Sequence, residues 1–175
     1  MRPFADPHIH IDKAGTALLS DDAPATIGEA IATMGSVKKE AAANPDAIRD
    51  RMVSMLEHLR RAGTRYLRAL VDVDETWGLV SFRVATSLRE TFAEDMVIRI
   101  EVFPQEGLTP KVEELMRQAV EEGADAIGAH TDIDEDPVAA IRTAANIARD
   151  AGLPLQVHVD ETASPDSFKL PQVLD

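Results

Sequence analysis

The fold class of this chain follows from residues Asp46–Asp74, whose sequence is DAIRDRMVSMLEHLRRAGTRYLRALVDVD. In its first part, apolar residues recur every three or four positions, which predicts a helix over Asp46–Ala62. Gly63 is a typical residue to end that helix. The run Thr64–Asp74 follows directly and is expected to form a strand. A helix followed at once by a strand is the unit from which the rest of the chain is built.

The same unit recurs along the sequence, and at three of its junctions a glycine stands between helix and strand, namely Gly63, Gly123 and Gly152. The expected strands are Arg2–Ile11, Thr64–Asp74, Met96–Phe103, Ala124–Ala129 and Leu153–Val159. The expected helices are Ile27–Lys39, Asp46–Ala62, Trp77–Ala93, Lys111–Glu122 and Pro137–Ala151, and the tail from Thr162 onward resembles the start of another helix.

This alternation predicts an α/β fold with parallel strands and right-handed crossovers. Two architectures fit it: a doubly wound sheet and part of a (β/α)8 TIM barrel. A complete barrel takes about 250 residues, so a chain of 175 residues holds only part of one. The sequence contains no linker or low-complexity segment, and we interpret residues 1–175 as a single domain.

The composition excludes several classes of protein. With 18 Lys and Arg against 31 Asp and Glu, the net charge is −13, which argues against binding to nucleic acid or to anionic lipid. The absence of cysteine excludes disulfides, thiolate zinc sites and cysteine nucleophiles. The sequence has neither an apolar run long enough to cross a bilayer nor a signal segment. We expect a cytoplasmic protein.

The first expected strand ends in a histidine pair. His8 and His10 are two positions apart, so both point to the same face of the strand and can bind one zinc- or iron-like ion. An alternative is that both rings are hydrogen-bonded to backbone or solvent at a strand edge. Their position at the carboxyl end of a strand favours metal binding, because active sites of parallel α/β folds lie at those ends.

The fifth expected strand ends in His158-Val159-Asp160-Glu161. His158 supplies a third imidazole at the same rim, and a carboxylate beyond it can act as general acid and base. Strict alternation places Asp160 on the face of His158. Glu161 turns inward only if the strand has ended and the chain bends there. The alternative is a salt-bridged carboxylate pair at the start of a loop.

Other strand exits carry weaker signals. Gln105, after Phe103 and Pro104, has an amide that can bind the edge of a flat ring, but it also fits an ordinary solvated turn. The acidic exits at 71–75 and 132–136 offer ligands for a hard cation but follow no known calcium-loop spacing. Asp136 and Pro137 are more typical of a helix start. We assign no role to His58. His130, where the fourth expected strand ends, either lines a pocket or lies at the surface.

Together these motifs resemble the amidohydrolase superfamily, and within it the cytosine deaminase branch. The similar stretches occur in the family's order: PHIHIDK at 7–13, VDVD at 71–74, VFPQEG at 102–107, GADAIGA at 123–129 and VHVDE at 157–161. The resemblance implies a partial (β/α)8 TIM barrel of about five parallel strands in consecutive order, with helices on the outer face. It also implies one divalent metal ion, zinc or iron.

The resemblance further implies roles for individual residues. His8, His10 and His158 would bind the metal, Glu161 would move protons, Gln105 would bind the substrate ring and Phe103 would wall the pocket. The implied reaction is hydrolytic deamination, or C–N cleavage, of a small nitrogen heterocycle.

The sequence also departs from this family. Relatives often carry Thr-His before Val71, and some carry cysteine in place of Val159, which argues against cytosine as the substrate. The family's further histidine and aspartate ligands belong to strands beyond the fifth, so we expect negligible deaminase activity from this chain alone. Without closure of the barrel, we expect its inner face to be open to water and its edge strands to be exposed. Both features predict a homo-oligomer or pairing with the missing barrel half. A non-enzymatic doubly wound signalling module, or an inactive assembly partner, is the alternative.

Overall fold

The computed structural model describes residues 2–16, 24–41 and 44–174. Its strands form one parallel sheet in the order β1-β2-β3-β4-β5. They are β1 (Phe4–His10), β2 (Thr64–Asp72), β3 (Val97–Phe103), β4 (Ala126–His130) and β5 (Leu155–His158). The consecutive order confirms the partial barrel and excludes the doubly wound sheet, in which the order of the strands would reverse.

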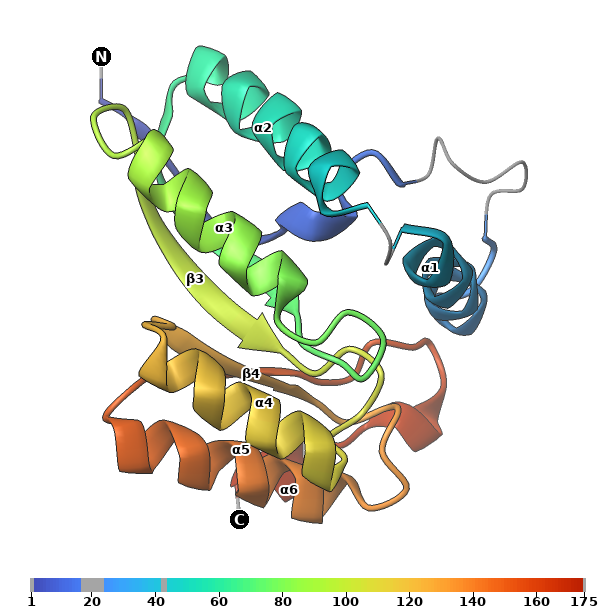
Figure 1. Cartoon of the computed structure of the whole chain (residues 1–175). Helices are drawn as coiled ribbons and strands as arrows, with labels where there is room; N and C mark the ends of the chain where they lie inside the picture. Colours follow the sequence, from blue (N-terminus) through green and yellow to red (C-terminus); the bar gives the residue numbers. More distant parts are fainter. Residues whose placement is uncertain (1, 17–23, 42–43, 175) are drawn as a thin grey trace.

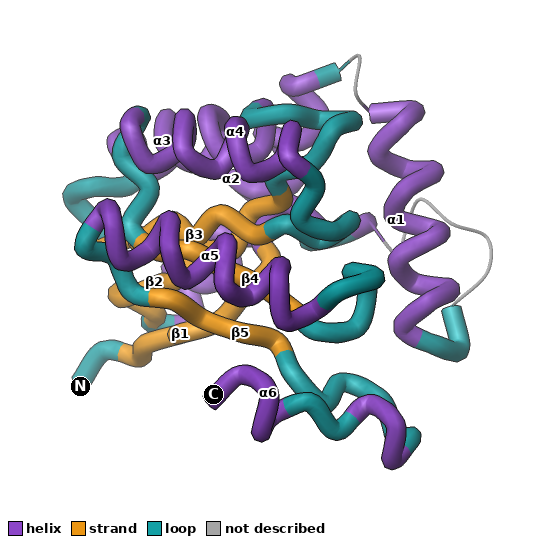
Figure 2. Tube along the Cα trace, turned by 90° about the horizontal axis from the view of Figure 1, so that it is seen from below, coloured by secondary structure: helices purple, strands orange, loops and turns teal. Residues whose placement is uncertain are grey.

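The helices are α1 (Ile27–Ala41), α2 (Pro45–Ala62), α3 (Val80–Thr91), α4 (Pro110–Glu121), α5 (Pro137–Ala151) and α6 (Leu170–Leu174). Helices α2 to α5 lie along the outer face of the curved sheet, whereas α1 stands apart on the side toward which the β3 arrow points (Figures 1 and 2). Within the described residues, no helix is long and apolar enough to cross a membrane.

The expected element boundaries differ from the observed ones mainly after the second strand. The helix expected from Trp77 begins only at Val80. The reason is that one carboxylate oxygen of Asp74 accepts the backbone N–H groups of Thr76 and Trp77, which forms a turn there. The other boundaries differ by at most two residues, except that the helix expected from Thr162 onward is observed as α6, which begins only at Leu170. The predicted cap is confirmed, because the Asp136 side chain accepts the N–H of Ala139 at the start of α5.

Strand β3 shows how the two faces of the sheet differ. Ile98, Ile100 and Val102 are buried in the hydrophobic core between sheet and helices. Because side chains alternate along a strand, Glu101 and Phe103 point to the concave inner face. The apolar core therefore lies outside the sheet, and the inner face carries polar and aromatic groups.

We expected the inner face to be open to water, and for its middle layer that expectation is wrong. Leu70, Glu101 and Phe103 are each 0% exposed. Exposure is high at the amino-terminal ends of the strands, where Phe4 is 60% and Tyr66 53% exposed, and along the edge strand β1 it extends as far as His8. The expected exposed edge is therefore present along β1.

The middle layer is covered because the sheet curls until side chains of its first and last strands meet. The side-chain amide of Gln156 on β5 contacts the ring of His8 on β1, and Arg68 on β2 donates a 2.8 Å hydrogen bond to Oε1 of Gln156. Strands β1 and β5 accordingly lie on the same side of the molecule in Figure 2. This contact across the interior shields the groups beneath it.

Candidate metal centre and adjoining pocket

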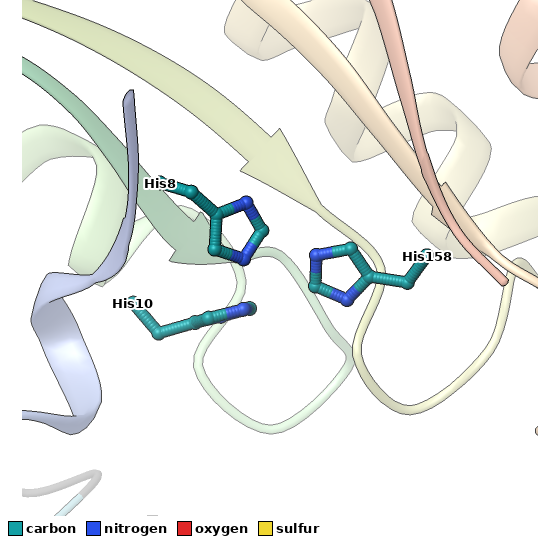
Figure 3. A group of neighbouring side chains, drawn as sticks. All are labelled: His8, His10 and His158. Carbon is teal, nitrogen blue, oxygen red and sulfur yellow. The ribbon is translucent and has the colours of Figure 1, made fainter. Parts of the chain in front are cut away.

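The three predicted histidines converge at the carboxyl ends of β1 and β5. One nitrogen from each of His8, His10 and His158 lies within 4.8 Å of the others. The ring centroids are 4.8 to 5.2 Å apart, and the rings point toward one another (Figure 3). Two residues on the same face of one strand and a third about 150 positions away are thus brought to a single point.

Two of these rings have nitrogens suited to binding a metal ion. Burial, with a contribution from Lys13, lowers the pKa of His10 to about 3. Burial and the neighbouring His8 lower the pKa of His158 to about 4, so both rings are neutral at pH 7. Within the described residues, Nδ1 of His10 and Nε2 of His158 are buried without a hydrogen-bond partner. Neutral imidazoles with unshared lone pairs fit a zinc or ferrous ion.

His8 is arranged differently. Arg68 is a pure donor and occupies Oε1 of Gln156, so the group of Gln156 that faces His8 is its NH2. Nδ1 of His8 therefore accepts a hydrogen bond, and Nε2 carries the ring proton. His8 can bind a metal ion through Nδ1 only if the ion replaces Gln156 there. It can bind through Nε2 only if the ring proton moves from Nε2 to Nδ1.

The chain bends immediately after His158, which decides which carboxylate faces the site. Strand β5 ends at His158, and Asp160 adopts a left-handed backbone conformation with φ +58°. Oδ1 of Asp160 then accepts the N–H of Lys169, whereas Oε1 of Glu161 lies 3.5 Å from Nδ1 of His158. Burial raises the pKa of Glu161, and Asp132 adds to that effect.

Phe103 supports the histidines from below. Its ring centroid lies 4.4 Å from that of His158 and 5.3 Å from that of His10. Gly128 makes room for it, because a Cβ at that position would come within 2.5 Å of the Phe103 ring. The aromatic ring therefore packs behind the histidines and is not among the residues that line the cavity.

Gln105 is held in one orientation by Lys13. Nζ of Lys13 donates to Oε1 of Gln105 at 2.6 Å and to Asp72 at 2.7 Å. Because an ammonium group can only donate hydrogen bonds, the atom that faces it must be the amide oxygen. The NH2 of Gln105 is thus left for other partners, and the predicted ring-binding residue offers a donor.

The ammonium group of Lys38 is buried beside Lys13 and Asp72. Nζ of Lys38, from α1, is 2.7 Å from Asp72, 2.6 Å from Asp74 and 3.2 Å from Glu106. The Lys38 side chain is 0% exposed. Burial favours the neutral amine, but Asp72 and Asp74 outweigh burial and raise the pKa of Lys38. Burial acts to raise the pKa of Asp72, but Lys13 and Lys38 outweigh burial and lower it.

This cluster corrects one interpretation of the sequence. The acidic exit at 71–75 is not an open site for a hard cation, because Asp72 and Asp74 are already neutralised by Lys38 and Lys13. In the second acidic exit, Asp134 accepts the N–H of Leu108 instead.

The two remaining histidines have different environments. His58 is exposed on α2. His130 is 2% exposed, and its Nε2 lies 3.0 Å from the carbonyl oxygen of Pro104. The Nε2–H of His130 thus fixes the loop that carries Gln105.

A cavity of about 190 Å³ adjoins the histidines. It is lined by His10, Lys13, Ala30, Ile31, Met34, Gln105, His158 and Glu161. The parts that Lys13, Lys38 and α1 play in forming this site were not predicted from the sequence. The Lys13 position, three residues after His10, was visible in the sequence, but nothing local indicates that Lys38 is buried.

Comparison with protein-family models gave no match for this chain, and comparison with curated proteins gave none either. Solved structures do match. The crystal structure of 5-methylcytosine deaminase from Klebsiella pneumoniae, liganded with 5-fluorocytosine, superposes with a TM-score of 0.88 at 29% identity. The same enzyme liganded with phosphonocytosine gives 0.88 at 28%. Both comparisons cover 98% of this chain and 42% of the enzyme.

A second solved structure is also similar. N-isopropylammelide isopropylaminohydrolase from Burkholderia multivorans ATCC 17616 gives a TM-score of 0.77 at 27% identity, over 94% of this chain and 42% of that one. The chain therefore spans less than half of the length of the structures that it matches. Its fold is that of part of an amidohydrolase, as the sequence motifs indicated.

Proposed function

We propose that this chain provides the metal-binding and substrate-binding rim of a metal-dependent hydrolase that cleaves a C–N bond in a nitrogen heterocycle. His8, His10 and His158 hold the metal, zinc or iron, in this proposal. The observation that carries it is the convergence of three imidazoles, two of them neutral and with a buried unshared nitrogen, beside a cavity. A divalent ion held there would supply the Lewis acidity that makes water reactive near neutral pH.

The other residues of the rim have complementary tasks. Glu161 is a carboxylate of raised pKa at the edge of the cavity, so it can take a proton from attacking water and pass one to the leaving amine. Gln105 offers its NH2 to an acceptor atom of the ring, because Lys13 occupies its oxygen. Phe103 packs behind His10 and His158 and keeps their rings in place.

The proposed ligand class follows from these groups and from the matched structures. One of those enzymes is a 5-methylcytosine deaminase and the other an N-isopropylammelide isopropylaminohydrolase. A small flat heterocycle with an acceptor atom is therefore the substrate class that we propose for this site. The edge strands β1 and β5 are where a second copy or further barrel strands would pair.

The first test measures metal binding directly. The purified metal-free chain is titrated with Co²⁺, and the visible spectrum reports a bound ion. We expect one ion per chain, and we expect His10→Ala or His158→Ala to weaken binding by at least about 100-fold, since each variant removes a ligand.

His58→Ala is the matched control, because His58 is exposed on α2 and far from the cluster in sequence. It should bind Co²⁺ as the unmodified chain does. Equal weakening by all three substitutions, or no binding by the unmodified chain, would reject the metal site.

A further inference from the structure

The cavity beside the histidines has two chemically different sides. Its polar side consists of His10, Lys13, Gln105, His158 and Glu161, from the strand ends. Its apolar side consists of Ala30, Ile31 and Met34, all from α1. A ligand in this cavity is therefore recognised by hydrogen bonds on one side and by apolar contact on the other.

The apolar side is held in place although α1 stands apart from the other helices (Figures 1 and 2). Met34 and Lys38 are four residues apart, and Ile31 precedes Met34 by three, so the three side chains share one face of the helix. Lys38 inserts between Asp72 and Asp74. The indole N–H of Trp77 also donates to the carbonyl oxygen of Lys38 at 2.8 Å. These contacts attach the carboxyl-terminal half of α1 to the strand ends.

The same contacts link the apolar side to the polar one. Asp72 binds Lys38 through one carboxylate oxygen and Lys13 through the other, each at 2.7 Å. Lys13 in turn holds Oε1 of Gln105. The position of the apolar residues relative to the Gln105 amide is thus set by a continuous series of ion pairs and hydrogen bonds.

The size of the cavity limits what can occupy it. Its volume is about 190 Å³, and an apolar protein cavity of about 150 Å³ is known to hold one benzene ring. One six-membered ring with a small substituent fits this space.

We propose that Ile31 and Met34 of α1 determine the specificity of this site by binding an alkyl substituent of the heterocycle whose polar edge faces Gln105. This inference rests on the proposed function. The substrate is then an alkyl-substituted single ring, and the residues that select it lie on a helix outside the strand-end motifs.

The test compares two probes that differ by one methyl group. Binding of 5-methylcytosine and of cytosine to the full chain, with zinc added, is measured by isothermal titration calorimetry. We expect the methylated ring to bind about fourfold more tightly, which is the effect of burying one methyl group. In Ile31→Asn and in Met34→Gln the ratio of the two dissociation constants should fall to about one.

Two variants serve as controls. Ala32→Asn places the same new side chain at the next, exposed position of α1, and Ile31→Val keeps an apolar side chain at the wall. Both should keep the preference for the methylated ring. Ile31 is only partly buried, so its replacement leaves the fold intact, which circular dichroism checks.

The outcomes separate the two hypotheses. If both rings bind and the ratio is unaffected by Ile31→Asn and Met34→Gln, the assignment to α1 is wrong while the proposed function stands. If neither ring binds to the unmodified chain, the proposed function fails, and the inference fails with it.

Discussion

The two faces of the sheet are built from the same strands but carry different side chains. The convex face is apolar, whereas the concave face also carries charged groups. Toward the helices, β2 presents Leu67, Ala69 and Val71, all nearly or fully buried in the apolar core. Toward the interior it presents Arg68 and Asp72. Burial stabilises the first set by the hydrophobic effect alone, whereas every charge on the second face needs a partner.

Stability and chemistry therefore reside on different faces of this molecule. The convex face could be replaced by other apolar residues of similar volume with little effect on any site. The concave face and the strand ends instead hold Lys13, Lys38, Asp72, Asp74 and Glu101 under cover. The energetic cost of burying Lys38, Asp72 and Asp74 is offset only while their ion pairs stay intact. Glu101 makes no ion pair among the described residues, and its burial favours the protonated form. The following substitutions test this difference between the faces.

Removing the buried cation should have the largest effect. Lys38→Met leaves Asp72 and Asp74 buried with one cation fewer, and we expect a loss of about 3–5 kcal/mol in the free energy of unfolding. Urea denaturation monitored by Trp77 fluorescence measures it. Lys39→Met changes the exposed neighbour and should alter stability by less than about 0.5 kcal/mol. Similar values for the two variants would show that the ion cluster contributes little.

An apolar truncation on the convex face should come next. Ile100→Ala removes a side chain that is 0% exposed in the core, and we expect a loss of about 2–5 kcal/mol. Val97→Ala, on the same strand but at a position that is 49% exposed, should cost far less. If both truncations had the same effect in urea denaturation, the helix-covered face would not be the main apolar core.

The smallest effect concerns Glu101 and depends on pH. Both carboxylate oxygens of Glu101 are buried without a hydrogen-bond partner within the described residues. Burial raises its pKa from 4.5 to about 7, although Arg68 acts in the opposite direction. A raised pKa means that the folded state holds the proton more tightly than the unfolded state. The contribution of Glu101 to stability is therefore complete below pH 4.5 and is lost as the pH rises through about 7.

Glu101→Gln removes this dependence. We expect the variant to be about 1–3 kcal/mol more stable than the unmodified chain at pH 8 and nearly equal to it at pH 4.5. Thermal unfolding at both pH values measures the difference. Glu121→Gln, at an exposed position of α4, is the control and should show no such pH-dependent gain. A gain of the same size at both pH values would contradict the role of Glu101 ionisation.

Much of the fold could be predicted from local sequence patterns. The helix-then-strand unit at 46–74, with Gly63 in the left-handed conformation at the junction, recurs as expected. The pair His8 and His10 shares one face because of strand geometry, and His158 ends the fifth strand at the same rim. These features depend on residues that are close in the chain.

Other features were not predictable from local patterns. The choice between Asp160 and Glu161 depends on where β5 stops. The strand ends at His158, and the chain then turns at Asp160, which has a positive φ. The burial of Lys38 depends on the docking of α1 against Asp72 and Asp74. The shielding of the inner face depends on how far the sheet curls.

Local spacing and composition were thus enough to predict the order of helices and strands, the apolar face of each and the residue types at each strand end, because these are properties of neighbouring residues. The folded chain was needed to establish which of those strand-end groups meet, which carboxylate turns inward and which lysine is buried. Such outcomes depend on the curvature of the whole sheet and on the cost of leaving a buried charge unpaired, and both involve residues far apart in the chain.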